Sequence, residues 1–356
     1  MKAVKLLPKD KTRFHFGRGV EGIKADFASD QLFSALINNY ANLYLGEVKD
    51  IIADFQTGDV EISSLFYGLN FQPVDRKDSP EKNIYFLPKP ILNYKFGDDA
   101  QKYKKFKQAD YISENLFEKI AKSWNKRDKE IKADNFEIQF LGSKFIMEKG
   151  ELEILNINEK RLPDINLIST SSRPRVKIDR WLTEEERDTF FQEYLQINEE
   201  KLGNYLLKPF HYFMIKGDID KRLKASIKVM AEEGLGGKRS VGFGSYRDCK
   251  IEDYSLPKIP SDYYLTLSSV IPKKEEIDNL GNYKLEERSG YIYAKRGRSI
   301  KKEKMRVIAS GSLLNDRIKG KIVEVSPKGF EDRIEHPVYL NGRSFLLNFG
   351  GEDIGS

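Results

Sequence analysis

The glycine-rich segment GLGGKRSVGFGSY, residues 234–246, constrains the fold more than any other part of this sequence. Its five glycines surround a Lys-Arg-Ser core. An apolar stripe with helical spacing precedes the segment at 218–233, and a strand pattern follows from residue 240. The segment therefore joins the end of a helix to a strand, and this order limits both the topology and the chemistry of the loop.

The patterns around this segment have the order βαββαβ once a long insertion is set aside. We predict strands at 2–7, 59–69, 208–217 and 240–254, and helices at 29–45 and 218–233. The helix at 29–45 has the clearest apolar stripe, with Ser29 as its expected N-cap. This order predicts an α+β fold and a ferredoxin-like domain, the arrangement that RNA-recognition modules share.

Two domains are expected from the length of 356 residues. The first covers 1–256 and carries an insertion at about 71–205, with an extended segment at 86–94 and a helix at 114–124. Pro257 and Pro260 form a natural linker. A smaller domain, 257–356, follows with strand patterns at 263–272, 283–294, 304–314, 320–327 and 336–349 and one short helical segment at 275–280. If this second domain is also ferredoxin-like, it is degraded.

Composition excludes several classes of protein. The only cysteine is Cys249, and the three histidines, His15, His211 and His336, are scattered, so we expect neither a disulfide framework nor a metal site, and no cofactor. No apolar run approaches the roughly 20 residues that span a bilayer, and the charged start does not resemble a signal peptide, so we expect a cytoplasmic protein without membrane contact. The net charge of +6 argues only weakly for nucleic acid.

Local basic segments point more clearly to a polyanion. Basic residues outnumber acidic ones between 288 and 328, and KYKKFKQADY (102–111) mixes lysines with aromatics, although a solvated helix or strand face explains the latter better. In RPRVKIDR (173–180), Arg173, Arg175 and Lys177 lie two residues apart, so a strand would present all three on one face. Such a strip suits backbone phosphates, but a charged edge strand protected from aggregation is an equally good explanation.

The position of the glycine-rich segment excludes the common nucleotide-binding loops. A dinucleotide-binding turn follows a strand and opens a helix, whereas here a helix ends and a strand follows. A Walker A loop also fails, because Arg239 follows Lys238 and no glycine lies at the required upstream position. Some of the glycines would serve a left-handed helix cap and a bulge. The remainder, around Lys238 and Arg239, suit the close approach of a polymer backbone and its phosphates.

This loop resembles the C-terminal glycine-rich loop of the RAMP superfamily of CRISPR RNA-binding proteins, and the chain is similar to the family of the fourth Csm subunit of type III-A interference complexes. The motifs that carry the resemblance are FHFG (14–17), SDQLFSALI (29–37), FLPKP (86–90), RPRVKIDR (173–180), GLGGKRSVGFG (234–244), RSGYIY (288–293), ASGSLL (309–314) and HPVYLNGRSF (336–345). The resemblance implies two RAMP-type ferredoxin-like domains and a non-catalytic subunit. Its expected partners are the repeat-derived 5′ tag of the crRNA, the large polymerase-like subunit, the backbone RAMP subunit, and target RNA near the boundary between tag and spacer.

The resemblance also implies which residues contact RNA. The loop residues Gly234, Gly236, Gly237, Lys238, Arg239 and Ser240 would hold phosphates of the tag, with His15, Gly17 and Arg18 nearby and Lys89 contributed by the FLPKP motif. RPRVKIDR, with Arg173, Arg175, Lys177 and Arg180, would belong to a thumb-like hairpin that separates tag from spacer.

Enzymatic alternatives remain open from the sequence. Related RAMP endoribonucleases process CRISPR repeats without metal, and many use a histidine as general base on the ribose 2′-hydroxyl, for which His15 or His211 are the candidates here. A backbone subunit that cleaves target RNA through an aspartate is a third interpretation, with Asp26 or Asp30 as nominees. The long insertion and the second domain fit that subunit poorly.

Overall fold

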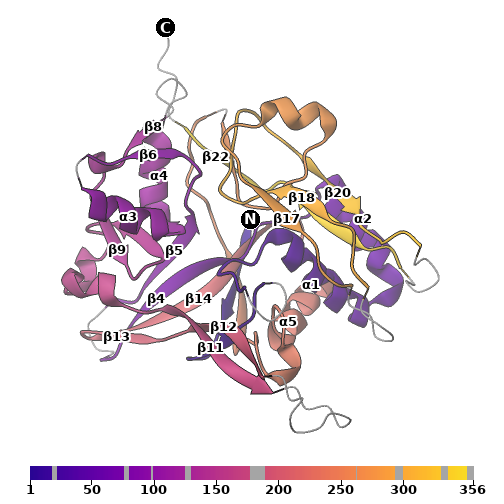
Figure 1. The fold of residues 1–356 in the computed structure, drawn as a ribbon, viewed down its shortest axis with the longest axis horizontal. Coiled ribbons are helices and arrows are strands. Elements are labelled where there is room, and N and C mark those ends of the chain that lie inside the picture. The colour runs from indigo at the N-terminus through magenta and orange to yellow at the C-terminus, as the bar shows by residue number, and fades with distance from the viewer. Residues whose placement is uncertain are drawn as a thin grey trace.

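The computed structural model describes residues 1–17, 22–75, 80–97, 99–124, 130–176, 189–261, 263–292, 300–329 and 336–350. It shows a mixed α+β molecule built around one large sheet (Figure 1). The C-terminal strands lie beside α1 and α2 (Figure 1). Helix α4 also meets the C-terminal region, because the ring of its Phe117 lies 5.6 Å from that of Phe349. The helices are α1 Ser29–Leu43, α2 Val48–Thr57, α3 Ala100–Gln108, α4 Glu114–Ser123 and α5 Lys221–Glu233.

The large sheet has the strand order β15-β1-β14-β4-β5-β7-β10-β9. Its strands are β15 Asp248–Asp253, β1 Lys2–Leu7, β14 Tyr205–Lys216, β4 Phe66–Pro73, β5 Lys82–Pro88, β7 Tyr111–Ser113, β10 Phe145–Glu148 and β9 Ile138–Leu141, with β13 Glu200–Leu202 and β3 Glu61–Ile62 also pairing with β14. The first four strands of this order are antiparallel to their neighbours. The predicted insertion therefore extends the sheet beyond β4 instead of forming a separate layer.

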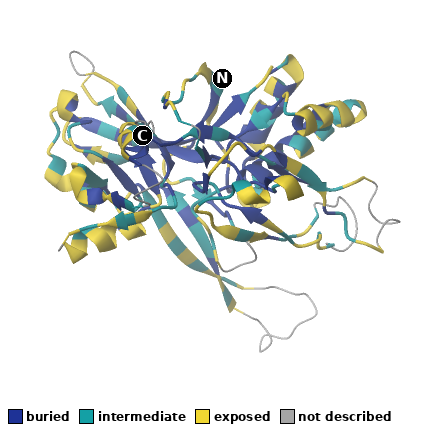
Figure 2. Cartoon of the chain, turned by 90° about the horizontal axis from the view of Figure 1, so that it is seen from above, coloured by how far each residue is buried: buried dark blue, intermediate teal, exposed yellow. Residues whose placement is uncertain are grey.

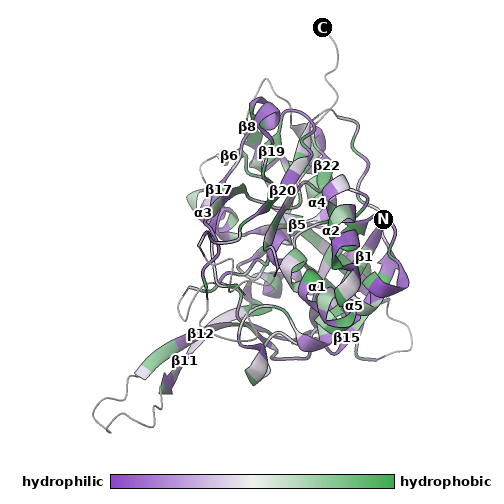
Figure 3. Ribbon diagram, turned by 90° about the vertical axis from the view of Figure 1, so that its right-hand side faces the viewer, coloured by the Kyte–Doolittle hydropathy of each residue, from purple (hydrophilic) through white to green (hydrophobic). Residues whose placement is uncertain are grey.

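The remaining strands form small sheets. They are β11 Ile168–Val176, β12 Thr189–Ile197 and β2 Arg13–Phe14; β19 Leu313–Leu314, β16 Tyr264–Thr266 and β22 Leu346–Asn348; β17 Leu285–Arg288 with β18 Met305–Ile308; β20 Gly320–Glu324 with β21 Tyr339–Arg343; and β6 Asn93–Lys95 with β8 Glu130–Lys132. Strands β11 and β12 form a long hairpin that extends away from the body of the molecule (Figure 3). Strand β2 pairs with β12 and so ties this hairpin to the segment that follows β1.

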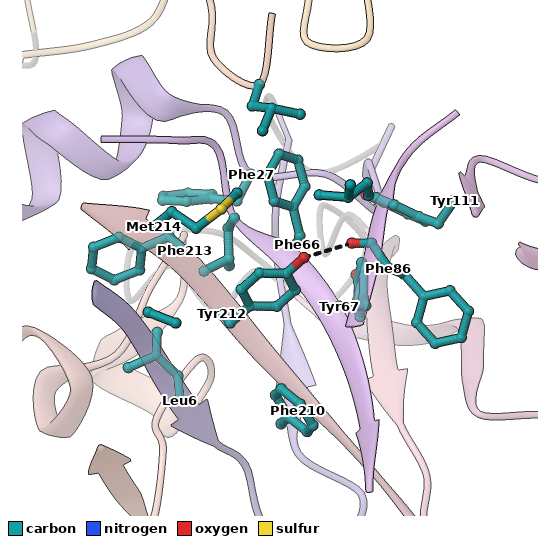
Figure 4. Packing of buried hydrophobic residues seen from close by; sticks show 14 of the residues in the cluster. Leu6, Phe27, Phe66, Tyr67, Phe86, Tyr111, Phe210, Tyr212, Phe213 and Met214 are labelled. Carbon is teal, nitrogen blue, oxygen red and sulfur yellow. Dashed lines mark hydrogen bonds between the residues drawn. The ribbon is translucent and has the colours of Figure 1, made fainter. Parts of the chain in front are cut away.

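The core is centred on β14, whose residues 210–214 are all buried. Aromatic side chains from β14 and β4 pack together here, and the Tyr212 hydroxyl donates a hydrogen bond of 3.0 Å to the carbonyl oxygen of Phe86 (Figure 4). Figure 2 shows this buried centre surrounded by exposed residues at the periphery. Leu265 and Phe345, from the C-terminal region, belong to the same hydrophobic cluster. The two halves of the chain therefore share one core.

Helix α1 confirms the strongest sequence prediction, with Leu32, Phe33 and Leu36 buried. Its N-cap differs from the expectation, because the helix begins at Ser29 and Ala28 occupies the cap position. The amide of Ala28 donates to the side chain of Gln31. The Ser29 hydroxyl accepts a hydrogen bond from the amide of Ser269 instead, at 2.8 Å, so it is used in a contact with the C-terminal region.

Several boundaries also differ from the predicted ones. The segment 59–69 does not form one continuous strand. The strand pairing is interrupted between β3 and β4 at Ser63 and Ser64, where the Ser64 amide donates a hydrogen bond to the carbonyl of Leu267. Helices α2 and α3 lack a predicted counterpart. The strand predicted from residue 240 begins only at Asp248, and the short helix predicted at 275–280 is a 3₁₀ turn, Lys274–Asn279. No helix in the described ranges has the length and hydropathy that crossing a bilayer requires.

Candidate nucleic-acid interface

The base of the glycine-rich loop is closed by backbone contacts. Helix α5 ends at Glu233, and the amide of Gly234 donates to the carbonyl of Met230 at 3.0 Å. The amide of Leu235 then donates to the carbonyl of Gly244, also at 3.0 Å, which joins the two ends of the loop. Gly244 has φ 80°, and a Cβ there would lie 2.1 Å from the carbonyl oxygen of Leu235. No side chain fits at this position.

The loop also packs on the residues that follow β2. The amide of Gly237 donates a hydrogen bond to the carbonyl of His15 at 2.9 Å, and the amide of Gly244 donates to the carbonyl of Arg13, in β2, at 2.8 Å. A Cβ on Gly236 would lie 2.7 Å from the His15 carbonyl oxygen. Close packing of protein backbone therefore accounts for most of the glycines. Gly242 differs, because no atom lies within 4 Å of where its Cβ would be.

The tip of the loop is exposed and positively charged. Lys238 has φ 62°, and a 3₁₀ turn, Arg239–Val241, follows it. Lys238 and Ser240 are exposed, whereas Arg239 is half-buried and forms an ion pair of 3.3 Å with Glu233. Among the described residues, the amides of Lys238, Arg239 and Ser240 have no hydrogen-bond acceptor. The tip thus offers a cation and three backbone donors, which is the chemistry that binds phosphate oxygens.

His15 lies beneath this loop and connects it to the β11–β12 hairpin. Its imidazole is buried, and Nδ1 lies 3.0 Å from the carbonyl oxygen of Glu193 on β12. The carboxylate of Glu193 accepts a hydrogen bond from the amide of Gly22 at 3.0 Å. Gly17 forms an isolated antiparallel bridge with Ile23. Arg18, which we predicted to contact RNA, lies outside the described residues.

The hairpin brings one of the predicted arginines, Arg173, to the loop. Arg173 and Arg175 share one face of β11, as predicted, whereas Lys177 and Arg180 fall beyond the part of the hairpin that the structure describes. The guanidinium carbon of Arg173 lies 5.8 Å from the ring centroid of Phe243, inside the loop. Arg175 donates from Nε to the side-chain oxygen of Gln192 at 3.1 Å.

Two aromatic rings with a cation on each side link these segments. The guanidinium of Arg13 lies 5.1 Å from the ring centroid of Tyr194, and this ring lies 6.0 Å from that of Phe243. Arg173 covers Phe243 from the hairpin. Contacts of this kind contribute about 0.5–1 kcal/mol each at partly exposed positions. They fix the angle between hairpin and loop, so the cationic tip and the hairpin arginines form one surface.

Lys89 is not part of this surface. Its ammonium donates to the carbonyl of Phe106 at 2.5 Å and lies 4.8 Å from the Phe106 ring, at the C-terminal end of α3. Burial lowers the pKa of Lys89 to about 8. Its cation therefore neutralises the end of a helix dipole.

The nuclease candidates occupy buried positions. His211 is fully buried among Phe14, Phe16 and Tyr67, and its Nδ1 lies 2.8 Å from the hydroxyl of Tyr246. Burial lowers the pKa of His211 to about 3, so the imidazole is neutral at physiological pH. In the described ranges, no three histidine, cysteine or acidic side chains form a group that could hold a metal ion.

Of the aspartates of the third interpretation, Asp30 is buried and Asp26 is half-buried. The Asp30 carboxylate accepts hydrogen bonds from Arg288 Nε at 3.0 and 3.1 Å. Burial raises the pKa of Asp26, which lies next to Lys24. The carboxylate of Asp30 is therefore already paired within the protein.

The contacts also identify residues that the sequence did not single out. Arg13, Tyr194, Phe243 and Glu193 hold the three segments together, and Gln192 lies between the arginines of the hairpin. Glu193 contacts His15 across 178 residues of sequence. No local pattern indicates such a contact, although Phe243, an aromatic residue between two glycines, was a visible signal.

Comparison with known proteins agrees with this arrangement. Residues 260–349 match the family described as the CRISPR Csm4 C-terminal domain. A "CRISPR system Cms protein Csm4" of Methanocaldococcus jannaschii is 30% identical over 98% of both chains. The protein of the same name from Streptococcus thermophilus is 25% identical over 89% of this chain and 90% of its own length.

Solved structures give the same result. The fold is similar to a chain in a Csm3-Csm4 subcomplex of the type III-A CRISPR-Cas interference complex, with a TM-score of 0.62, 25% identity and coverage of 98% of this chain and 100% of that chain. It is also similar in fold to a chain in a Csm1-Csm4 cassette in complex with cA4, with a TM-score of 0.54, 19% identity and 98% coverage of both. The resemblance read from the glycine-rich loop and the dispersed motifs is confirmed, and the chain belongs to the Csm4 family of CRISPR proteins.

Proposed function

We propose that this chain is a non-catalytic, RNA-binding subunit of a type III-A CRISPR interference complex, and that its glycine-rich loop binds the repeat-derived 5′ tag of the crRNA. The observation that carries this proposal is the tip of the loop. There, Lys238 is exposed and the amides of residues 238–240 have no acceptor in the described part of the chain, while backbone contacts with His15 and Gly244 hold the base of the loop in place. Preformed donors of this kind bind phosphates without ordering the loop again.

The partners follow from the family. The related chains come from a Csm3-Csm4 subcomplex and a Csm1-Csm4 cassette. We infer that this chain caps one end of the filament of backbone subunits, links it to the large subunit, and meets target RNA where tag and spacer join. The hairpin β11–β12 extends away from the body and carries Arg173 next to the loop, with Arg175 on the same face, which supports its assignment as the element at that boundary (Figure 3).

The finer fold is part of the same proposal. In a ferredoxin-like βαββαβ unit, the four strands lie in the order 4-1-3-2, and β15-β1-β14-β4 has this order with α1 and α5 as the two helices. We assign residues 1–256 to this first domain. We assign 257–356 to a second, degraded domain of the same type, and the family match at 260–349 supports a boundary close to Pro257.

The endoribonuclease alternative is not favoured. A general base must reach the proton that it removes, and the two nitrogens of His211 lie inside the core. His15 is buried and directs Nδ1 to the hairpin backbone. Incubating labelled repeat RNA with the chain, without metal, tests this alternative. Cutting that disappears in His15→Ala would establish the nuclease and overturn the non-catalytic assignment.

The double variant Lys238→Ala, Arg239→Ala tests the tag site. We expect tag-bearing RNA to bind at least tenfold more weakly, and the slope of log affinity against log salt to fall by about 1.4, because two phosphate contacts are lost from a single strand. The matched control, Lys104→Ala with Lys105→Ala on the exposed face of α3, removes the same charge and should leave the affinity for the tag unchanged. An unchanged affinity in the loop variant would contradict the proposal.

A further inference from the structure

Gln192 is a buried amide whose oxygen is hydrogen-bonded but whose nitrogen is not, among the residues that the structure describes. Its side chain is 2% exposed and lies on the face of β12 that carries the neighbouring arginines of β11. The amide oxygen accepts from Arg175 Nε at 3.1 Å, which fixes the orientation of the amide. The nitrogen, Nε2, is buried without a hydrogen-bond partner in the described chain. Such a donor destabilises the fold, and native proteins keep few of them.

Arg173 contains a second donor of the same kind. Its Nε is buried and has no partner among the residues that the structure describes. Arg173 and Gln192 lie directly opposite each other in the antiparallel register, which places their Cβ atoms roughly 5 Å apart on one face of the hairpin. Two adjacent N–H donors therefore lack an acceptor at the same place.

This place adjoins the loop that we assign to the RNA tag. The Arg173 guanidinium covers the ring of Phe243, and the amide of Phe243 lies 3.4 Å from the carbonyl oxygen of Lys238. An RNA strand whose phosphates lie at the loop tip would thus continue next to the hairpin. In the part of the hairpin that the structure describes, no carboxylate contacts either donor, so an oxygen of the ligand would be their first acceptor.

We propose that Gln192 and Arg173 form a binding position for one oxygen acceptor of the bound RNA, either a phosphate oxygen or a ribose 2′-hydroxyl, at the tag site. This inference rests on the proposed function. Arg175 acts as a positioning residue, because its hydrogen bond to the amide oxygen turns Nε2 into the free donor. Retaining two unpaired donors in the free protein is explained by their use in the complex.

Two substitutions at one position test the inference. Gln192→Leu removes the unpaired buried donor together with the acceptor of Arg175, which is only partly buried and can donate to water instead. We therefore expect the affinity for tag-bearing RNA to fall about tenfold or more while the melting temperature changes little. Gln192→Glu keeps the acceptor for Arg175 and places a second oxygen near Arg173, so RNA binding should fall without loss of stability. Gln196→Leu is the control, because Gln196 lies on the same strand with its amide nitrogen already bonded to Asn198 at 2.8 Å.

The ligand itself separates the two sources of the acceptor. Tag RNA with single 2′-deoxy substitutions should lose affinity at one nucleotide for the wild type but not for Gln192→Leu if the acceptor is a 2′-hydroxyl. If the acceptor is a phosphate oxygen, a single methylphosphonate linkage at that position should lower the affinity for the wild type but not for Gln192→Leu. Wild-type affinity in both Gln192 variants would overturn the inference and leave the tag site intact, provided Lys238→Ala, Arg239→Ala still weakens binding. A wild-type chain that binds tag and scrambled RNA equally would overturn the proposed function instead.

Discussion

Two polar regions of this molecule use their buried groups in opposite ways. At the junction between the halves of the chain, the Asp30 carboxylate accepts hydrogen bonds from Arg288 and from the Ser269 hydroxyl, at 2.8–3.1 Å. Arg288 also donates to Glu286 at 2.7 Å and to Ser269 at 3.1 Å. Burial alone would raise the pKa of Glu286, but the hydrogen bond and charge of Arg288, with Lys24, lower it to about 2.

The interface formed by loop and hairpin is incomplete by comparison. Gln192 Nε2 and Arg173 Nε are buried without partners among the described residues, as is His211 Nε2 in the core, and Lys238 is exposed at the loop tip. A closed network fixes one arrangement of two chain segments, whereas open donors on a rigid base are available to a ligand. The junction is thus a structural element, and the interface has the properties of a binding site.

The largest expected effect breaks the closed network. Arg288→Ala leaves the Asp30 carboxylate buried without its counter-ion, so we expect the free energy of unfolding to fall by about 3–5 kcal/mol. Urea denaturation measures this loss. The control is Lys304→Ala, which removes an exposed ion pair with Glu287 and should change stability by less than about 1 kcal/mol. Equal effects of the two substitutions would contradict the structural role of the junction.

The next effect separates packing from exposure within the loop. Gly244→Ala forces a left-handed residue against the carbonyl of Leu235, so we expect a loss of about 3 kcal/mol and a displaced tip that binds tag RNA weakly. Gly242→Ala has a similar φ of 83° but open space around it, and should cost only about 1 kcal/mol. Thermal unfolding and RNA titration of both variants provide the comparison. A milder effect at Gly244 would show that the base of the loop is not rigid.

The smallest effect concerns His211 and pH. Because burial lowers the folded-state pKa of His211 to about 3, its contribution to stability is fully present above the unfolded value of about 6.5 and is lost as pH falls toward 3. The slope from this one group is about 1.4 kcal/mol per pH unit. In His211→Phe, stability should therefore fall less steeply between pH 6.5 and 5 than in the wild type. If the stability of the wild type and of His211→Phe falls equally steeply with pH, the imidazole of His211 is in contact with solvent and the prediction is wrong.

Elements whose pattern is local were predictable. The stripe of α1, the apolar run of β14 and the helix α5 before the glycines are confirmed, because their periodicity reflects burial of one face or of both. The lysine-rich segment 102–111 shows the limit of such patterns. It forms most of α3 and the start of β7. Phe106 and Tyr111 are buried, as the solvated-face interpretation expected, whereas Tyr103 is exposed.

The site was predictable in its chemistry but not in its geometry. Lys238 and Arg239 within a glycine-rich connection from helix to strand indicated a phosphate-binding loop from sequence alone. The division of the glycines into packed and free ones was not visible, because it depends on where His15 and Arg13 run past the loop. The RNA-binding roles assigned to the loop and hairpin residues stay predictions until the variants above are measured.

The sequence by itself determined the order of helices and strands around the glycine-rich loop, the charge at its tip and, through dispersed motifs, the family. Only the tertiary structure decided that Glu193 meets His15 and that Arg173 meets Phe243, and that Gln192 is left with an unused donor. The physical reason is that periodicity and turn chemistry act between near neighbours in sequence. Burial and hydrogen-bond satisfaction depend on contacts between segments that lie far apart in the chain.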